Sequence, residues 1–211
     1  MRTVMIATPT YDGKVHVRYL DSLLQTVRSA PADIGIFPVY IPGDALVQRA
    51  RNSLCGIALA ARDGTGVDDV VFIDADIGWK AEDFFRLLSH SCGIVGGAYR
   101  QKRDDTVLVY RPRDGEQPND EGLLAVEAIG CGFLRISGEA LKRLWDDAAE
   151  YRDGPVTMRA IFECRVERGE LLSEDIAMCR RWTALGGSIY LDTRIECDHI
   201  GERVYRIGDK A

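Results

Sequence analysis

Several kinds of sequence feature are missing from this chain, and each absence excludes a class of protein. No apolar run reaches roughly 18 residues, so no segment is expected to span a membrane, and the first residues predict a strand rather than a signal peptide. The six cysteines are scattered and form no C-x-x-C pair. That arrangement favours reduced, mostly buried thiols in a cytoplasmic protein over a zinc site or a disulfide framework.

The chain also lacks an excess of basic residues. Lysine and arginine number 27 against 33 aspartates and glutamates, which gives a formal net charge of −6. A broad nucleic-acid partner is therefore not expected, because such a protein needs a basic face to replace the phosphate counterions. No internal repeat and no low-complexity segment is present. A length of 211 residues with 46% hydrophobic residues predicts one packed domain over residues 1–211.

Strands and helices alternate in the first half of the predicted structure. Short apolar runs predict strands at 3–7, 34–40, 70–73 and 93–99, and Pro38 indicates that the second strand lies near a sheet edge. Helical spacing of apolar residues predicts helices at about 15–29, 44–61 and 80–90, the second with Asp44 as its N-cap. This β-α alternation predicts an α/β protein with a mainly parallel sheet covered by helices.

The second half of the sequence has a different pattern. Strands are expected at 106–111, 123–128, 133–136 and 188–191, and helices at 138–149 and from Ser173, as N-cap, to about 184. Residues 151–172 show weak periodicity and mixed charge, which predicts a loop or small flap. We therefore expect a smaller half with mixed strands after the parallel part.

Asp74 and Asp76 follow directly on the four apolar residues of the strand at 70–73. Ligands bind α/β proteins at the carboxyl ends of such strands. Two carboxylates separated only by Ala75 need a counter-charge, for which a divalent cation is the usual choice. The alternative is that Asp74 caps the strand and Asp76 begins a solvated turn.

A second polar group occurs on the helix expected from Asp44. Arg49 and Asn52 are three residues apart and share a face, and Arg51 lies between them. A guanidinium group suits diphosphate or base contacts because it is planar and always charged. The alternative is an ordinary solvated helix face. Of the other conspicuous residues, Trp79 and Trp182 are expected in the core, and His16 and His90 as ordinary surface or helix residues.

Six segments in this order resemble the GT-A class of nucleotide-sugar glycosyltransferases. The likeness is to the short, single-domain, family-two-like enzymes of bacteria and large DNA viruses, and it covers nearly the whole chain. Each segment is weak evidence by itself, and the order of all six carries the resemblance. The segments are 8–11 (TPTY), 49–52 (RARN), 72–79 (FIDADIGW), 130–133 (GCGF), 173–182 (SEDIAMCRRW) and 198–201 (DHIG).

The resemblance implies a nucleotide-donor half at 1–100 and an acceptor and catalytic half at 101–211. Asp76 would be the direct ligand of Mn²⁺ or Mg²⁺, with Asp74 nearer the ribose or a metal-bound water, and His199 would complete the metal site. The metal would stabilise charge on the departing diphosphate. For His199 the alternative is a strand-end histidine bonded to a backbone carbonyl.

The remaining roles implied by the resemblance concern the nucleotide and the proton. Residues that would line or reach the nucleotide are Thr8, Pro9, Thr10, Tyr11, Arg49, Arg51, Asn52, Asp74 and Ala75. Gly130 and Gly132 would let the backbone approach the donor sugar or the acceptor. Asp175 would be the base that takes the proton of the acceptor hydroxyl in an inverting single displacement. Its alternative role is to favour the helix N-terminus together with Glu174.

Three function classes remain for comparison. The resemblance favours a metal-dependent transferase that moves a sugar from a nucleoside diphosphate donor, preferably a UDP-sugar, to a carbohydrate or other hydroxyl acceptor. A sugar-1-phosphate nucleotidylyltransferase would start with a glycine-rich basic loop, which the first turn (TPTYDG) does not provide. A non-catalytic nucleotide- or glycan-binding module would bind without turnover. Because no long extension follows the last segment, the acceptor site is expected to be small or completed by a partner or a second protomer.

Overall fold

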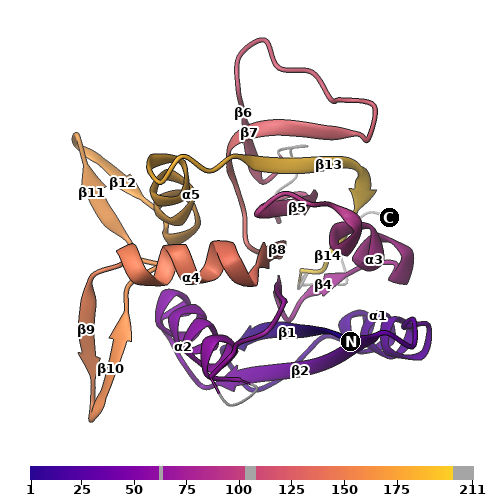
Figure 1. The fold of residues 1–211 in the computed structure, drawn as a ribbon, viewed down its shortest axis with the longest axis horizontal. Coiled ribbons are helices and arrows are strands. Elements are labelled where there is room, and N and C mark those ends of the chain that lie inside the picture. Colours follow the sequence, from indigo (N-terminus) through magenta and orange to yellow (C-terminus); the bar gives the residue numbers. More distant parts are fainter. Residues whose placement is uncertain (62–63, 103–107, 202–211) are drawn as a thin grey trace, which may run out of the picture.

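A computed structural model of the protein describes residues 1–61, 64–102 and 108–201. Its centre is an eight-stranded sheet in the order β2-β1-β3-β8-β5-β13-β7-β6 (Figure 1). β7 and β8 run antiparallel to the other strands, so the sheet is mostly parallel, as predicted. The strands are β1 Arg2–Thr10, β2 Ile34–Pro42, β3 Asp69–Ile73, β5 Ile94–Ala98, β6 Tyr110–Pro112, β7 Leu123–Ile129, β8 Phe133–Ser137 and β13 Ile189–Glu196.

β3 is the strand from which the aspartate pair emerges, and it is buried along its whole length. Its apolar run has no polar alternation because both faces of the strand are covered. β1 lies between β2 and β3, parallel to both. β2 forms the edge of the sheet, which confirms the position inferred from Pro38.

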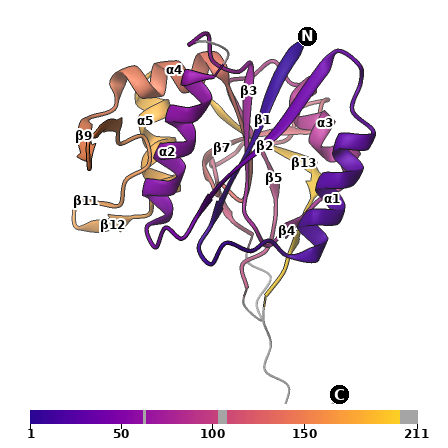
Figure 2. The same cartoon turned by 90° about the horizontal axis from the view of Figure 1, so that it is seen from below.

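Helices cover the sheet on two sides (Figure 2). α1 Val17–Arg28 and α3 Ala81–Ser89 lie on one face, and α2 Val47–Ala60, α4 Gly138–Asp147 and α5 Glu174–Ala184 lie on the other. Alternate residues of β1 enter the two hydrophobic layers: Ile6 packs with Tyr19 and Phe84, whereas Met5 packs with Leu54 and Leu141. The period of two along the strand thus produces two cores, one under each set of helices.

The expected helix from Asp44 begins later than predicted. Its first residue is Val47, and its N-cap, Leu46, makes no side-chain capping bond. The Asp44 carboxylate instead accepts a hydrogen bond from the Leu46 backbone N–H at 2.9 Å and pairs with Arg49. Asp44, in the loop that precedes α2, therefore stabilises the first turn of this helix.

Residues 151–172 are not a plain loop but contain two short hairpins. β9 Glu150–Asp153 pairs with β10 Val156–Arg159, and β11 Arg165–Glu167 pairs with β12 Glu170–Leu172. Both are separate from the central sheet and lie on the outer side of the helices α4 and α5 (Figure 1). Most of their residues are exposed or half-buried, so the sequence shows little of the hydrophobic alternation that would predict strands.

Of the strand expected at 106–111, residues 106 and 107 lie outside the described residues. Leu108 forms an isolated bridge with Arg100, and β6 begins at Tyr110. Trp79 and Trp182 are buried, as predicted. All six cysteines are free, and Cys164 is exposed. Within the described ranges, every helix is too short or too polar to cross a membrane.

Candidate functional site

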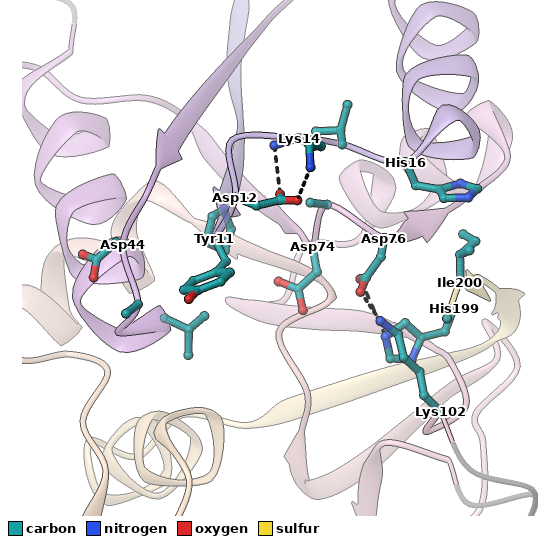
Figure 3. A pocket seen from close by; sticks show the side chains of 16 residues that line it. Tyr11, Asp12, Lys14, His16, Asp44, Asp74, Asp76, Lys102, His199 and Ile200 are labelled. Atoms are coloured by element: carbon teal, nitrogen blue, oxygen red, sulfur yellow. Dashed lines mark hydrogen bonds and ion pairs between the residues drawn. The ribbon is translucent and has the colours of Figure 1, made fainter. Parts of the chain in front are cut away.

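A pocket of 770 Å³ opens where β1 and β3 end (Figure 3). The turn after β1 contributes one wall, the turn after β3 contributes the floor, and the chain after β14 (Asp198–His199) contributes the opposite wall. Both halves of the sequence therefore supply residues to it. The lining residues are Pro9, Tyr11, Asp12, Lys14, Val15, His16, Asp44, Ala45, Val47, Asp74, Ala75, Asp76, Lys102, His199, Ile200 and Gly201.

Backbone hydrogen bonds fix the turn that carries Asp74 and Asp76. The Asp74 N–H donates to the carbonyl of Gly132 at 3.1 Å, and the His16 N–H donates to the carbonyl of Ala75 at 2.8 Å. The Ile200 N–H donates to the carbonyl of Asp76 at 2.9 Å. Three distant segments thus hold one short turn, so the two carboxylates are presented by a rigid support.

His199 lies beside Asp76 because of a two-residue antiparallel ladder. β14 pairs with β4 (Ile77–Gly78), with His199 opposite Ile77. The His199 Nδ1–H donates to the backbone carbonyl of Arg100 at 2.6 Å, which leaves Nε2 at 3.6 Å from Asp76 Oδ1. Histidines that bind metals usually donate their other ring N–H in this way, which fixes the tautomer. Asp76 and His199 therefore form a pair of aligned candidate ligands (Figure 3).

A metal site built from protein side chains alone would need more than these two ligands. In the described ranges no set of three His, Cys, Asp or Glu side chains comes together around one point. A hard divalent cation in a nucleotide site is typically held by one or two carboxylates, with substrate phosphates and water completing its shell. The residues present fit a cation that binds together with a diphosphate. Lys102, whose ammonium group pairs with Asp76 Oδ2, supplies the counter-charge in the structure.

Each carboxylate that lines the pocket is paired with a cation. Four aspartates line it, of which Asp74 pairs with Arg51 and Asp76 with Lys102. Hydrogen bonds from Lys14 lower the pKa of Asp12, and those from Arg49 lower the pKa of Asp44, so both carboxylates stay ionised at neutral pH.

Arg51 forms ion pairs with two carboxylates of the protein itself. The guanidinium is buried, with Nη2 at 2.7 Å from Asp74 Oδ1 and Nη1 paired with Glu174. Burial disfavours its charge, but Asp74, Cys131 and Glu174 raise the pKa of Arg51 above its ordinary value. Arg51 therefore joins the aspartate turn to the first turn of α5, and it does not line the pocket.

Besides Arg51, four of the polar side chains expected at the nucleotide do not line the pocket, namely Thr8, Thr10, Arg49 and Asn52. Arg49 instead pairs with Asp44. The Thr8 hydroxyl bonds with Tyr19 at 2.6 Å, and the Thr10 hydroxyl donates to the Ile41 carbonyl at 3.3 Å. The Asn52 amide is buried and bonds both backbone groups of Phe162 at 2.9 Å. These residues hold neighbouring segments, whereas the side chain of Tyr11 is 73% exposed at the pocket wall.

Positions 130 and 132 require glycine for a structural reason that the sequence did not reveal. A Cβ at either position would lie within 2.7 Å or less of the Tyr99 side chain. The Tyr99 hydroxyl accepts a hydrogen bond from the Gly132 N–H at 2.9 Å, and its ring packs edge-on against His199 with centroids 5.3 Å apart. The two glycines thus make room for the aromatic support of His199.

Asp175 lies in the first turn of α5 and lines another hollow, of 280 Å³. Its carboxylate accepts a hydrogen bond from the Ser173 hydroxyl and one from the Ile176 N–H at 2.7 Å. Ser173 is the N-cap, as predicted, but its hydroxyl bonds Asp175 rather than a backbone N–H. Because Glu174 pairs with Arg51, the Asp74–Arg51–Glu174 bridge connects the aspartate turn to the residue beside Asp175.

Sequence reasoning missed three polar residues. His16 is not an ordinary surface residue: it lines the pocket, and its Nδ1 accepts from the Arg18 N–H as the N-cap of α1. Its place just before an amphipathic run was the available signal. His90 is also not ordinary, since it is buried and bonded to Asp192 at 2.8 Å, outside the pocket. No local sequence pattern indicated that Lys102 would line the pocket.

Comparison with known proteins shows a similar fold in solved structures. No protein-family model matches the sequence, and no curated protein matches it. A197 from STIV superposes with a TM-score of 0.60 at 18% identity, over 96% of this chain and 87% of that one. GalNAc-T7, solved with UDP, GalNAc and Mn²⁺, superposes with a TM-score of 0.57 at 10% identity, over 99% of this chain but 44% of that one. At these identities the likeness concerns the fold, which is GT-A-like: a mostly parallel sheet flanked by helices.

Proposed function

We propose that the protein is a metal-dependent glycosyltransferase that moves a sugar from a nucleoside diphosphate donor to a hydroxyl acceptor. The observation that carries this proposal is the Asp76–His199 pair, held rigidly in a pocket at the end of β3. The fold is similar to that of GalNAc-T7, whose structure contains UDP and Mn²⁺. A UDP-sugar is therefore the preferred donor.

Each candidate side chain has a role in this proposal. Asp76 and His199 would hold Mn²⁺ or Mg²⁺, which when bound would supply positive charge to the departing diphosphate. Tyr11, exposed on the pocket wall, would stack on the nucleotide base. Asp74 is oriented by Arg51, so its second oxygen is left for the ribose or a metal-bound water.

Asp175 is proposed as the base of an inverting single displacement. An acceptor hydroxyl has a very high pKa, so a carboxylate must take its proton as the new bond forms. The hydroxyl of Ser173 and the N–H of Ile176 both donate to Asp175 Oδ1, which leaves Oδ2 for the acceptor. One displacement step leaves the anomeric carbon with inverted configuration.

One observation favours a second candidate, a nucleotide- or glycan-binding module without turnover. Lys102 already neutralises Asp76, so the pocket holds a cation of its own. The two candidates differ in turnover. A nucleotidylyltransferase has no comparable observation in its favour.

Turnover is tested by incubating the protein with Mn²⁺, a panel of UDP-sugars and a mixture of saccharide acceptors, and measuring released UDP. The wild type and the Asp33→Asn variant, which changes an exposed carboxylate outside the pocket, are expected to release UDP at equal rates. Asp175→Asn is expected to lower the rate by about 10²- to 10⁴-fold, the contribution typical of a general base. If Asp175→Asn released UDP as fast as the wild type, Asp175 would not be the base. Metal-dependent UDP binding without any release would favour the binding module.

A further inference from the structure

A second hollow adjoins the one that contains Asp175. Its volume is 460 Å³, and it lies between β6, β7 and α5. The two hollows share Arg111, Ala128 and Ile176 in their linings, so they form one continuous groove. We call it the β6–α5 groove; it shares no lining residue with the pocket that contains Asp76, but the Asp74–Arg51–Glu174 bridge connects the two.

Three arginines line the outer part of the β6–α5 groove, in a chain whose net charge is −6. Arg111 is exposed and Arg113 is half-buried, and neither is paired with a carboxylate in the described part of the chain. Arg180 is held by Glu167 at 2.9 Å and by Glu170 at 3.9 Å. Glu127 is the acidic residue of this outer lining, and Asp175 lies in the inner part, so the unpaired positive charge of the groove is that of Arg111 and Arg113 at its outer end.

We propose that the β6–α5 groove binds the acceptor and that the acceptor carries an anionic group, a phosphate or a carboxylate, on a saccharide. This inference rests on the proposed function, because it takes Asp175 as the base. Arg111 and Arg113 would hold the oxyanion, since a guanidinium fork matches phosphate and carboxylate in two-point contact. The Gln101 amide would donate or accept hydrogen bonds, and the Glu127 carboxylate would accept them, from neutral hydroxyls of the same sugar.

The position of the charges argues for the acceptor rather than the donor. The donor diphosphate needs the Asp76–His199 pair, which lies in the other pocket. Asp175 lies in the groove with Arg111, so an acceptor held by the arginines would present its hydroxyl along the same channel. The competing explanation is an ordinary solvated basic face, which has no contacts that would hold a monosaccharide in place.

The test compares binding of three monosaccharides, glucose, glucose 6-phosphate and glucuronic acid, to the whole protein by ligand-observed NMR titration. The wild type is expected to bind at least one charged sugar about tenfold more tightly than glucose, and salt should weaken that preference. The double variant Arg111→Gln with Arg113→Gln should lose the preference. Arg28→Gln, which changes an exposed arginine at the end of α1, should keep it. The preferred charged sugar distinguishes phosphate from carboxylate.

Equal or undetectable binding of all three sugars, or a preference that survives in the double variant, would overturn the inference. UDP binding with Mn²⁺ is measured on the same samples and separates this inference from the proposed function. If UDP binds but the sugars show no preference, the groove inference fails alone. If the arginine-dependent preference is present but UDP does not bind, the donor-site proposal fails and the groove remains an anionic saccharide site.

Discussion

Replacing Arg51 with methionine is expected to remove more stability than any other single change at the candidate site. Methionine fills similar space without charge, so the variant leaves Asp74 and Glu174 facing each other without a partner. Removing one member of a buried ion pair costs about 3–5 kcal/mol, because the remaining charge stays desolvated. The side chains of Asp74 and Glu174 are 29% and 14% exposed, so water reaches part of each and the lower end applies.

We therefore expect a loss of about 3 kcal/mol in the free energy of unfolding, against the 5–15 kcal/mol typical of a domain. For a chain of this size, that loss corresponds to a fall of about 6–12 °C in the melting temperature. Urea denaturation followed by circular dichroism measures the free energy directly. Arg51→Lys should fall between the wild type and Arg51→Met, since one ammonium group cannot hold both carboxylates as the guanidinium does.

A double-mutant cycle separates the ion pair from the loss of packing. If the pair matters, Glu174→Gln in the Arg51→Met background should cost less than in the wild type, because it removes an uncompensated charge. Additive effects, or a loss below about 1 kcal/mol for Arg51→Met, would show that Arg51 forms no stabilising buried pair, since exposed pairs contribute no more than that.

Three further predictions concern the metal ligands, Lys102 and the thiols. His199→Ala should weaken Mn²⁺ binding in the presence of UDP by at least about tenfold, measured by electron paramagnetic resonance of free Mn²⁺; an unchanged affinity would remove His199 from the site. Lys102→Met should strengthen binding of Mn²⁺ alone, because the ammonium group competes for Asp76, and weaker binding would show that the lysine does not compete. Cys164 should be the first thiol to react with a disulfide reagent in the folded protein, since burial raises the pKa of Cys179 to about 12; rapid reaction of a buried thiol would contradict the packing described for Cys55, Cys131 and Cys179.

The fold was largely predictable because its signals are local. The continuous apolar run of β3 indicates a strand covered on both faces, and α1 and α3 show the 3.6-residue helical spacing. The two hairpins of residues 150–172 escaped prediction because they have few buried residues, so their strands show no hydrophobic pattern.

The site was harder to predict than the fold, because its contacts join residues far apart in the chain. A two-residue ladder between β4 and β14 brings His199 to the aspartate turn. Lys102 pairs with Asp76 from a loop that contains no recognisable motif. Conversely, the spacing of Arg49, Arg51 and Asn52 indicated a shared function, but Asn52 holds the Phe162 backbone and Arg51 is buried between two carboxylates. Residue type and spacing do not reveal whether a polar side chain is used inside the protein.

We propose that Asp76 and His199 bind a divalent cation together with a nucleoside diphosphate. Thermal unfolding with UDP, GDP, CDP or dTDP, each with and without Mn²⁺, tests this proposal. A ligand at about 100 times its dissociation constant adds roughly 2.7 kcal/mol to the free energy of unfolding. For a chain of this length, that is a rise of about 5–11 °C in the melting temperature. We expect such a rise with one diphosphate only when Mn²⁺ is present, its loss in Asp76→Ala, and its retention in Asp33→Asn. A folded wild-type protein whose melting temperature does not change with any of the four nucleotides and Mn²⁺ would contradict the account.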